Sequence, residues 1–197
     1  MLKRSFDIVS SAVGLVLLAP IFVIVALWIR FDSKGPVLFR QIRVGLNGKT
    51  FSILKFRTMV IDAEKKGLQV TVGRDPRITV SGNFLRRSKL DELPQLLNVL
   101  IGEMSVVGPR PEVPEYMNEY ASDVRAAILS VRPGITDKAS IEYTNEAEIL
   151  AKSEDPRAAY INEVMPIKAQ YYLEYVKNNS FGSDLVIIFQ TLKKIAS

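Results

Sequence analysis

The chain has 197 residues, of which 48% are hydrophobic, and it carries a formal net charge of +5. This length suits one domain with a sizeable core, and the positive charge favours an anionic partner such as nucleic acid, a membrane surface or a phosphorylated small molecule. Because the sequence has no cysteine and no histidine, it excludes disulfides, thiolate zinc sites and thiol nucleophiles, and any metal site must use oxygen ligands, as Mg²⁺ prefers.

The N-terminal segment is apolar enough to enter a membrane. Residues 8–29 contain no charged residue, and a helix of this length would extend about 33 Å, close to the thickness of a bilayer core. A cleaved signal peptide is disfavoured because Pro20 follows Ala19 and the apolar run continues beyond it. A straight transmembrane helix and a helix that enters and returns to the same side both remain open.

Two features of this segment favour the re-entrant helix. Pro20 lies near the middle, where it would disrupt a helix interior. Basic residues flank both ends of the segment, among them Lys3, Arg4, Arg30 and Lys34. The positive-inside tendency would hold both flanks on the cytoplasmic side. The backbone carbonyl freed near Val16 would then need a polar partner, for which Ser10 and Ser11 are the candidates.

Beyond the Gly-Pro pair at residues 35–36, we expect a β-hairpin followed by a mostly helical chain. Residues 37–42 and 50–56 are predicted strands on either side of the turn LNGK. Residues 60–79 are predicted to form a short helix and a loop. Helices are expected at residues 92–100, 114–130, 144–152 and 157–178, with Pro166 opening the last of them. GEMSVVGPRPEVP is predicted to be a loop and RPGIT a turn.

The C-terminal segment DLVIIFQTLKKIAS is a predicted amphipathic helix. Its apolar residues at helical spacing are Leu185, Ile188, Phe189, Leu192 and Ile195. Packing in a core and lying on a lipid surface are equally open for this stripe. The sequence has no internal repeat and no second domain boundary, so we expect a membrane helix in residues 1–32 and one globular unit in residues 33–197. The expected fold class is α+β, mostly helical, with a small β-hairpin.

Two adjacent carboxylates stand in RRSKLDELPQLLNVL, at the start of a predicted helix. Proline is tolerated in the first helical turn, so Pro94 places the helix start near Leu90 or Asp91 and puts Asp91 close to the N-cap. The positive end of the helix dipole stabilises an ionised carboxylate and attracts phosphate. Asp91 could then attack phosphorus while Glu92 holds a magnesium ion. If the pair is considered without its surroundings, a simpler interpretation is that Asp91 only caps the helix and that Glu92 is exposed to solvent.

Basic residues around the pair favour the chemical interpretation. They are Lys55 and Arg57 in LKFRTM, Arg86 and Arg87 upstream of the pair, and Arg110 in GPRP. Prolines on both sides fix the backbone of Arg110, and its planar guanidinium suits bidentate contact with phosphate. We therefore expect an anionic, phosphorylated substrate at this place.

These residues resemble the bacterial sugar transferase family, the small monotopic phosphoglycosyl transferases that act on polyprenyl phosphate. The resemblance rests on four stretches in the same order, RSFDIVSSAVGLVLLAPIF, GPVLFRQIRVGLNGKTFSILKFRTM, RRSKLDELPQLLNVLIGEMSVVGPRPE and VRPGIT, and it resumes at YYLEYVKNNSFGSDLVIIFQT. Several long motifs in register make it highly specific. It implies a re-entrant membrane helix broken at Pro20, on the cytoplasmic face of the bacterial inner membrane, with residues 33–197 as the catalytic domain.

The resemblance also implies a reaction and its site. A sugar-1-phosphate would pass from a UDP-sugar to undecaprenyl phosphate with release of UMP, as the first membrane step of glycoconjugate synthesis. It implies that Asp91 is the nucleophile that forms a covalent phosphosugar intermediate, and that Glu92 is associated with Mg²⁺ and the diphosphate. The substrate-binding residues would be Lys55, Arg57, Arg86, Arg110 and Arg132. Membrane lipids are expected partners, nucleic acid is not, and a homodimer is left open.

The sequence departs from the family pattern after RPGIT, where many members continue with Gly-Trp-Ala-Gln and this chain has DKASIEYTNEAEIL. Residues 137–166 are therefore divergent, and the identity of the sugar cannot be carried over. The extra N-terminal transmembrane helices of larger relatives are missing, so we expect the catalytic unit alone.

Other functions are weighed against the transferase. A membrane-anchored scaffold without catalysis would not need the carboxylate pair. A nucleic-acid binder is suggested by charge alone, since no known binding module is present. A phosphatidyl transferase would need spaced aspartates on several spanning helices.

Overall fold

The computed structural model describes residues 2–63, 75–143 and 146–196, so that most of the segment 60–79 and the first two residues of the predicted helix 144–152 lie outside the described residues. The helices, in chain order, are α1 (Leu2–Leu17), α2 (Ala19–Asp32), α3 (Val80–Arg87), α4 (Gln95–Ile101), α5 (Pro114–Met117), α6 (Ser122–Ile128), α7 (Lys138–Glu142), α8 (Glu146–Lys152), α9 (Pro156–Ala159), α10 (Met165–Asn178) and α11 (Phe181–Ala196). The strands are β1 (Leu38–Val44), β2 (Thr50–Phe56), β3 (Ser105–Val107) and β4 (Gly134–Thr136). The predicted class, α+β and mostly helical, is confirmed.

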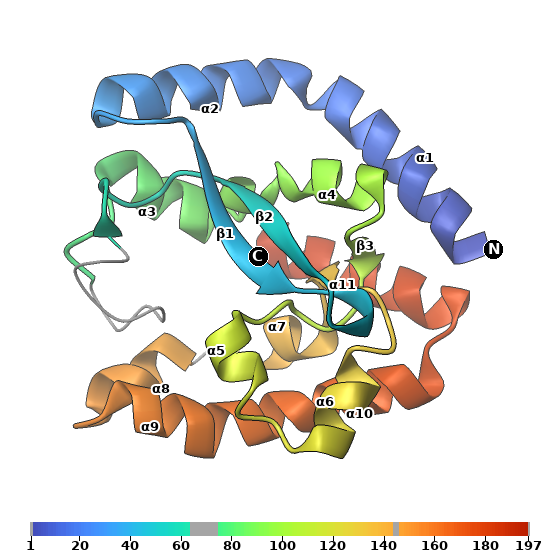
Figure 1. Ribbon diagram of the computed structural model, residues 1–197. Coiled ribbons are helices and arrows are strands. Elements are labelled where there is room, and N and C mark those ends of the chain that lie inside the picture. Colours follow the sequence, from blue (N-terminus) through green and yellow to red (C-terminus); the bar gives the residue numbers. More distant parts are fainter. Residues whose placement is uncertain (1, 64–74, 144–145, 197) are drawn as a thin grey trace.

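The elements form two helical layers with the hairpin between them (Figure 1). In this view α1 and α2 run along one side of the molecule, and α4 lies between α1 and the hairpin. Helices α9 and α10 run along the opposite side, where α6 lies against α10 and α5 contacts β1 of the hairpin. The hairpin and α4 therefore lie between the N-terminal helices and the C-terminal half of the chain.

The predicted hairpin is confirmed. Strands β1 and β2 pair antiparallel, with Leu38 opposite Phe56 and Val44 opposite Thr50. The turn contains Asn47 and Gly48, whose φ angles are +55° and +76°. Asparagine and glycine tolerate this left-handed backbone, which explains why LNGK closes the hairpin.

A second, parallel pair of strands was not predicted. GEMSVVGPRPEVP was expected to be a loop and RPGIT a turn, but β3 and β4 pair within them, Ser105 with Gly134 and Val107 with Thr136. The two segments approach closely because both carry glycine. A Cβ atom on Gly134 would lie 2.1 Å from the backbone nitrogen of Gly108, a distance that no side chain could accept.

The predicted helices differ from the observed ones where aromatic residues enter the core. The predicted helix 114–130 is divided into α5 and α6, and the intervening Tyr120 is buried. The predicted helix 157–178 is α9, a π-helical segment (Tyr160–Val164) and α10, and Pro166 lies in the first turn of α10 as predicted. Helix α7 was not predicted.

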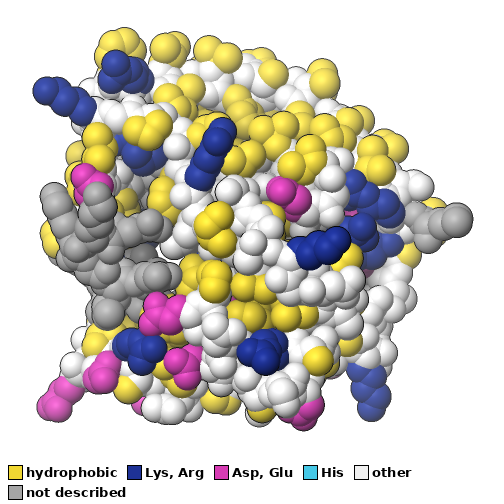
Figure 2. Space-filling model, in the orientation of Figure 1, with side chains coloured by type: hydrophobic (Ala, Val, Ile, Leu, Met, Phe, Trp, Pro, Cys, Tyr) yellow, Lys and Arg dark blue, Asp and Glu magenta, His cyan; other side chains and the backbone are white. Residues whose placement is uncertain are grey.

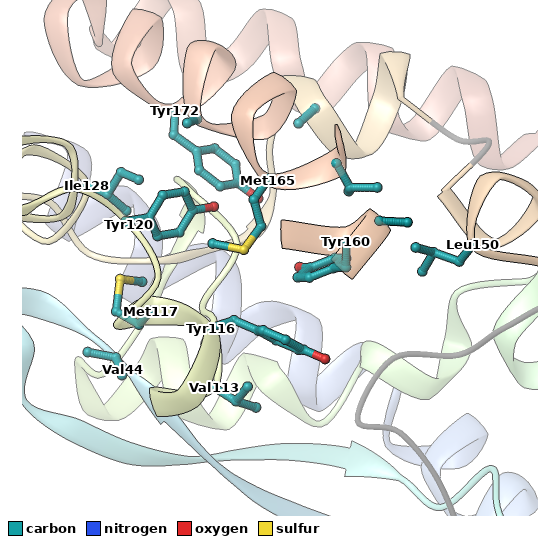
Figure 3. Close-up of a cluster of buried hydrophobic side chains, with 14 residues drawn as sticks. Val44, Val113, Tyr116, Met117, Tyr120, Ile128, Leu150, Tyr160, Met165 and Tyr172 are labelled. Atoms are coloured by element: carbon teal, nitrogen blue, oxygen red, sulfur yellow. The ribbon is translucent and has the colours of Figure 1, made fainter. Parts of the chain in front are cut away.

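The largest core cluster joins the C-terminal half of the chain (Figure 3). Its members include Val113, Tyr116, Met117, Tyr120, Ile128, Leu150, Tyr160, Met165 and Tyr172. A second cluster joins α2, β2 and α3 and consists of Val25, Ile29, Phe56 and Leu85. Burying each such large apolar side chain stabilises the fold by about 1.5–3 kcal/mol. These clusters hold β2, α3 and the loop before α5 in fixed relative positions.

Helices α1 and α2 meet at a bend of 61° next to Pro20. Leu18 N–H still donates to Gly14 O at 2.9 Å, but proline has no N–H to donate to Val16 O. The predicted partner Ser10 instead donates to Phe6 O at 2.7 Å, and Ser11 Oγ is buried without a partner among the described residues. The prediction that these serines bond the freed carbonyl is therefore wrong.

No single helix among the described residues is long and apolar enough to cross a membrane, whereas the bent pair α1–α2 meets the length and composition criteria jointly. Many apolar side chains of this pair are exposed, among them Val16, Leu17, Val23, Ile24 and Phe31. Figure 2 shows hydrophobic side chains gathered over this side of the molecule.

Helix α11 also turns apolar side chains outward. Phe189 is 69% exposed and Leu192 is 61% exposed, whereas Asp184 and Ile187 face inward. The sequence left open whether the apolar stripe of this helix packs in the core or lies on a lipid surface. Its exposure excludes packing in the core of this chain.

Polar contacts attach the start of α1 to the rest of the fold. The buried Asp7 carboxylate accepts hydrogen bonds from Ser105 Oγ at 2.9 Å and from Val106 N–H at 3.0 Å. Arg4 donates to Val99 O at 2.7 Å and to Leu100 O at 3.0 Å, at the carboxyl end of α4. Arginine there adds hydrogen bonds to carbonyls of the last helical turn.

Candidate active site

The carboxylate pair lies in a tight turn before α4. A 3₁₀ turn spans Leu90–Glu92, and Pro94 is the N-cap residue of α4. The predicted position of Asp91 near the N-cap of the helix is therefore wrong, because the α-helix begins only after Pro94. The turn is closed by a hydrogen bond from Glu92 N–H to Lys89 O at 3.2 Å. It places both carboxylates in the interior, since Asp91 is 7% exposed and Glu92 is 8% exposed.

A buried asparagine sets the position of α4 against the hairpin. Asn98 Oδ1 accepts a hydrogen bond from Leu54 N–H at 3.0 Å, and Asn98 Nδ2 donates to Ser52 O at 2.8 Å. These bonds fix α4 beside β2. Lys55, the next residue of β2, is thereby brought to the foot of α4, where the carboxylates lie.

Glu92 is held by two cations. Its Oε1 accepts a hydrogen bond from Lys55 Nζ at 2.8 Å and from Arg110 Nη2 at 2.6 Å. Burial pushes the pKa of Glu92 upward, but Arg110 and Lys55 outweigh burial and hold the pKa of Glu92 well below its usual range. Burial lowers the pKa of Lys55, and the Glu92 charge raises the pKa of Arg110. Glu92 is therefore ionised at neutral pH, as the shared counter-charge of Lys55 and Arg110.

Asp91 lies in a different environment from its neighbour. Its Oδ1 is buried and has no hydrogen-bond partner among the described residues. Burial raises the pKa of Asp91, Lys55 opposes this rise, and the nearby Glu92 charge adds to it. An ionised oxygen without a hydrogen-bond partner is a better nucleophile than a solvated one, because no donor has to be displaced before it attacks. Adjacent carboxylates with shifts in opposite directions are typical of groups with different chemical roles.

Arg110 is presented by a stiff loop between β3 and α5. Gly134 N–H donates to Pro109 O at 3.0 Å, and Arg43 Nη1 donates to Pro111 O at 2.9 Å, so both prolines that flank Arg110 are fixed. The predicted stiff presentation of Arg110 is consistent with this geometry.

Arg86 lies in the last turn of α3 and donates from Nε to Thr58 Oγ1 at 3.0 Å. Burial lowers the pKa of Arg86, and the charge of Asp91 opposes that effect. Three of the predicted cations, Lys55, Arg86 and Arg110, thus surround the carboxylate pair.

The other two predicted substrate-binding arginines are engaged elsewhere. Arg57 is 5% exposed, and it donates to Ser33 O at 2.9 Å, Lys34 O at 2.7 Å and Pro36 O at 2.6 Å. Its guanidinium therefore fixes the segment that follows α2. Arg132 donates to Gly102 O at 2.9 Å and lines a cavity of about 340 Å³ at the start of α1. Neither contacts the carboxylate pair among the described residues, so the structure does not bring these two arginines together with Lys55, Arg86 and Arg110, and their contact with substrate stays a prediction.

Replacing Arg57 with lysine should destabilise the fold while sparing the chemistry. The three nitrogens of the planar guanidinium each reach a different carbonyl oxygen, which the single nitrogen of a lysine ammonium cannot do with the same geometry. We expect a loss of about 1–3 kcal/mol in the free energy of unfolding, measured by thermal or denaturant unfolding in detergent. Arg87→Lys on the exposed face of α3 is the matched control. Unchanged stability with strongly reduced activity in Arg57→Lys would instead favour a substrate contact.

Two residues of the site were not named from the sequence. Asp137 follows β4 directly, and Gly108 N–H donates to Thr136 O at 3.1 Å, so Asp137 lies beside the loop that carries Arg110. Its carboxylate caps α7 by accepting from Ser140 N–H at 3.0 Å. Burial raises the pKa of Asp137, and the bonds from Ser140 and the charge of Arg110 oppose that rise. The departure of residues 137–166 from the family pattern was the one feature of the sequence that could have drawn attention to Asp137. The second residue is Thr58, whose hydroxyl accepts the hydrogen bond from Arg86, and nothing in the sequence indicated it.

Asp91 and Glu92 are the residues that would hold a magnesium ion if one were shared with a phosphorylated substrate. No group of three or more acidic side chains gathers into a metal site among the residues that the structure describes. Mg²⁺ commonly uses one or two carboxylates together with substrate phosphates and water. The buried, unpartnered Oδ1 of Asp91 beside the Glu92 carboxylate offers oxygen donors of this kind.

Comparison with known proteins agrees with the family resemblance of the sequence motifs. The family model "Bacterial sugar transferase" matches residues 1–197. The UDP-glucose:undecaprenyl-phosphate glucose-1-phosphate transferase of Escherichia coli (strain K12) is 39% identical over 197 residues, which cover 98% of this chain and 40% of that protein. The exopolysaccharide production protein PSS of Rhizobium leguminosarum bv. phaseoli is 42% identical over 206 residues, which cover 97% of this chain and 93% of that protein.

A third relative acts on a different sugar. The UDP-N-acetylgalactosamine-undecaprenyl-phosphate N-acetylgalactosaminephosphotransferase of Aeromonas hydrophila is 34% identical over 196 residues, which cover 98% of this chain and 43% of that protein. The chain thus spans less than half of the length of the larger relatives. Since the family match extends over all of its residues, the chain belongs to the bacterial sugar transferase family.

Proposed function

We propose that this chain transfers a sugar-1-phosphate from a UDP-sugar to undecaprenyl phosphate and releases UMP. The observation that carries the proposal is the buried Asp91–Glu92 pair, in which one carboxylate is neutralised by Lys55 and Arg110 and the other keeps an oxygen without a partner. The names of the relatives supply the class of donor and acceptor. A non-catalytic scaffold has no need of such a pair, because burying charged groups costs free energy.

In the first step, an Asp91 oxygen attacks the phosphorus that carries the sugar. A bond from Asp91 to phosphorus forms, the bond from that phosphorus to the UMP oxygen breaks, and UMP leaves with the electron pair. Arg86 and Arg110 lie beside the pair and would face the negative charge that builds up on the phosphate oxygens. Preorganised cations stabilise such charge effectively in a buried site. Mg²⁺ bound at Glu92 would add charge neutralisation on the diphosphate.

In the second step, the phosphate of undecaprenyl phosphate attacks the same phosphorus and displaces Asp91. The two displacements use one nucleophile and one set of cations, so the two substrates react in turn and the kinetics are ping-pong. Because the acceptor is a lipid, the site must lie at a membrane surface. The exposed apolar faces of α1, α2 and α11 support this placement, with α1–α2 as a re-entrant helix on the cytoplasmic face of the inner membrane.

A panel of UDP-sugars tests the proposal. Purified protein in detergent with Mg²⁺ should turn over one or more UDP-sugars to UMP only when undecaprenyl phosphate is present. The measurement is UMP release, with undecaprenol, which lacks the phosphate, as the matched control acceptor. Removal of the metal with EDTA should slow turnover. The proposal is contradicted if no UDP-sugar in the panel gives acceptor-dependent UMP release.

A further inference from the structure

The three cations around the carboxylate pair, Lys55, Arg86 and Arg110, are already engaged before substrate arrives. Lys55 and Arg110 both donate to Glu92 Oε1, and Arg86 donates to Thr58 Oγ1. A diphosphate and a lipid phosphate nevertheless each bring further negative charge to Asp91. A cation that is not held by a protein acceptor would meet this charge without breaking an existing bond.

Lys89 has the position and the exposure for this task. It lies two residues before Asp91 at the start of the same turn, and it is exposed. No hydrogen bond or ion pair holds its ammonium among residues 2–63, 75–143 and 146–196. Its charge nevertheless acts on the site, because it lowers the pKa of both Asp91 and Glu92 against the stronger effect of burial.

The backbone of Lys89 does not favour a lysine. Its φ and ψ are +57° and +12°, in the left-handed region that glycine and asparagine adopt more easily. The turn uses only the main chain of this residue, through Lys89 N–H to Arg86 O at 3.3 Å and Glu92 N–H to Lys89 O at 3.2 Å. Glycine would make the same turn with less strain, so the fold alone does not explain the side chain.

We propose that Lys89 is a substrate-contact residue whose ammonium binds a phosphate group beside Asp91. A flexible lysine, with a compact charge on a long stem, suits a phosphate that enters, reacts and leaves. The phosphate is that of the UDP-sugar, that of the polyprenyl acceptor, or each in turn. The inference rests on the proposed function, because it assumes that phosphorylated substrates react at Asp91.

Three substitutions in the full chain test the inference. Lys89→Gly and Lys89→Gln should lower kcat/KM by about tenfold or more, because a hydrogen bond to a charged group is lost. Lys89→Arg should recover most of that loss. Lys89→Gly should unfold at the same temperature as the wild type or a few degrees higher, which a purely structural lysine would not do.

Separate measurements of kcat/KM for the two substrates show which phosphate Lys89 binds. An effect confined to kcat/KM for the UDP-sugar assigns Lys89 to the diphosphate, and an effect confined to undecaprenyl phosphate assigns it to the lipid phosphate. Two controls lie in the hairpin turn. Asn47→Gly changes another left-handed residue, with φ +55°, and Lys49→Gln removes another exposed charge. Both should leave kcat/KM unchanged.

The inference is overturned if Lys89→Gly and Lys89→Gln keep kcat/KM within twofold of the wild type for both substrates. It is also overturned if Lys89→Arg is as impaired as Lys89→Gln, since the charge would then not be the cause. A wild-type protein that releases no UMP refutes the proposed function and the inference with it. Normal wild-type turnover with unaffected Lys89 variants refutes the inference alone.

Discussion

Asp91→Asn should abolish turnover while leaving the fold intact. The amide cannot attack phosphorus, and loss of a covalent nucleophile typically lowers kcat by more than about 10³-fold. UMP release measures this loss. Mass spectrometry of the intact protein after incubation with the UDP-sugar alone gives a second measurement, since the wild type should gain one sugar phosphate and the variant should gain none. Full activity in Asp91→Asn, or a sugar phosphate attached to another residue, would contradict the assignment of the nucleophile.

The same variant should be at least as stable as the wild type at neutral pH. Burial raises the pKa of Asp91 above its unfolded value of about 3.9. The folded state therefore binds this proton more tightly, and wild-type stability falls as pH rises from the unfolded value through the folded pKa. Asparagine does not ionise, so Asp91→Asn escapes this loss. A parallel loss of activity and stability would indicate a misfolded variant rather than a missing nucleophile.

The sequence motifs predicted which cations lie near Asp91 and Glu92, but they did not predict the backbone conformation of these two residues. Lys55, Arg86 and Arg110 gather around Asp91 and Glu92, as expected from charge near a turn. The predicted start of the helix was wrong because proline is tolerated both in the first turn of a helix and just before it. Pro94 is therefore compatible with a helix that starts at Asp91 and with one that starts after Pro94. Only the packing of α4 against β2 distinguishes these two possibilities.

The position of Arg57 could not be predicted from the sequence. Lys55 and Arg57 are two residues apart in LKFRTM, and alternation along a strand would put both on one face. Strand β2 ends at Phe56, however, so Arg57 leaves the strand and turns to carbonyls of the segment after α2. The segment that accepts these bonds is more than twenty residues away in the chain, and no local pattern indicates such a contact.

The β3–β4 pair was missed for a related reason. Each strand has three residues, too few for an alternating pattern to be recognised, and the pairing is parallel and non-local. This pair nevertheless positions Asp137 beside the loop of Arg110. The resemblance to the family identified the motifs on either side of the pairing but not the pairing itself.

Glu92→Gln should destabilise the fold, in contrast to Asp91→Asn. Glu92 Oε1 neutralises Lys55 and Arg110, and removing its charge leaves two partly buried cations without their shared counter-charge. Breaking a buried ion pair by removing one partner costs about 3–5 kcal/mol. The measurement is denaturant unfolding at neutral pH. Glu119→Gln is the matched control, because the partly exposed Glu119–Arg157 pair contributes at most about 1 kcal/mol.

The pH dependence of this loss follows from the pKa of Glu92. Because the folded pKa is held well below the unfolded value of about 4.3, the Glu92 charge contributes stability above the unfolded pKa, and that contribution is lost as pH falls through the folded pKa. The difference between wild type and Glu92→Gln should therefore be full at neutral pH and should shrink in acid. A difference that does not change with pH would contradict an electrostatic origin.

A double variant separates the ion cluster from the chemistry. If Glu92→Gln destabilises the fold by leaving Arg110 without a counter-charge, then Glu92→Gln combined with Arg110→Gln should cost less than the sum of the single variants. Activity should not recover with stability, because the double variant has lost the cation as well as the carboxylate that we assign to the substrate diphosphate. Additive losses in stability would mean that Glu92 and Arg110 are not coupled in the folded protein. Recovery of both properties would mean that the pair serves the fold alone, and Asp91 would then need a different electrostatic partner for phosphoryl transfer.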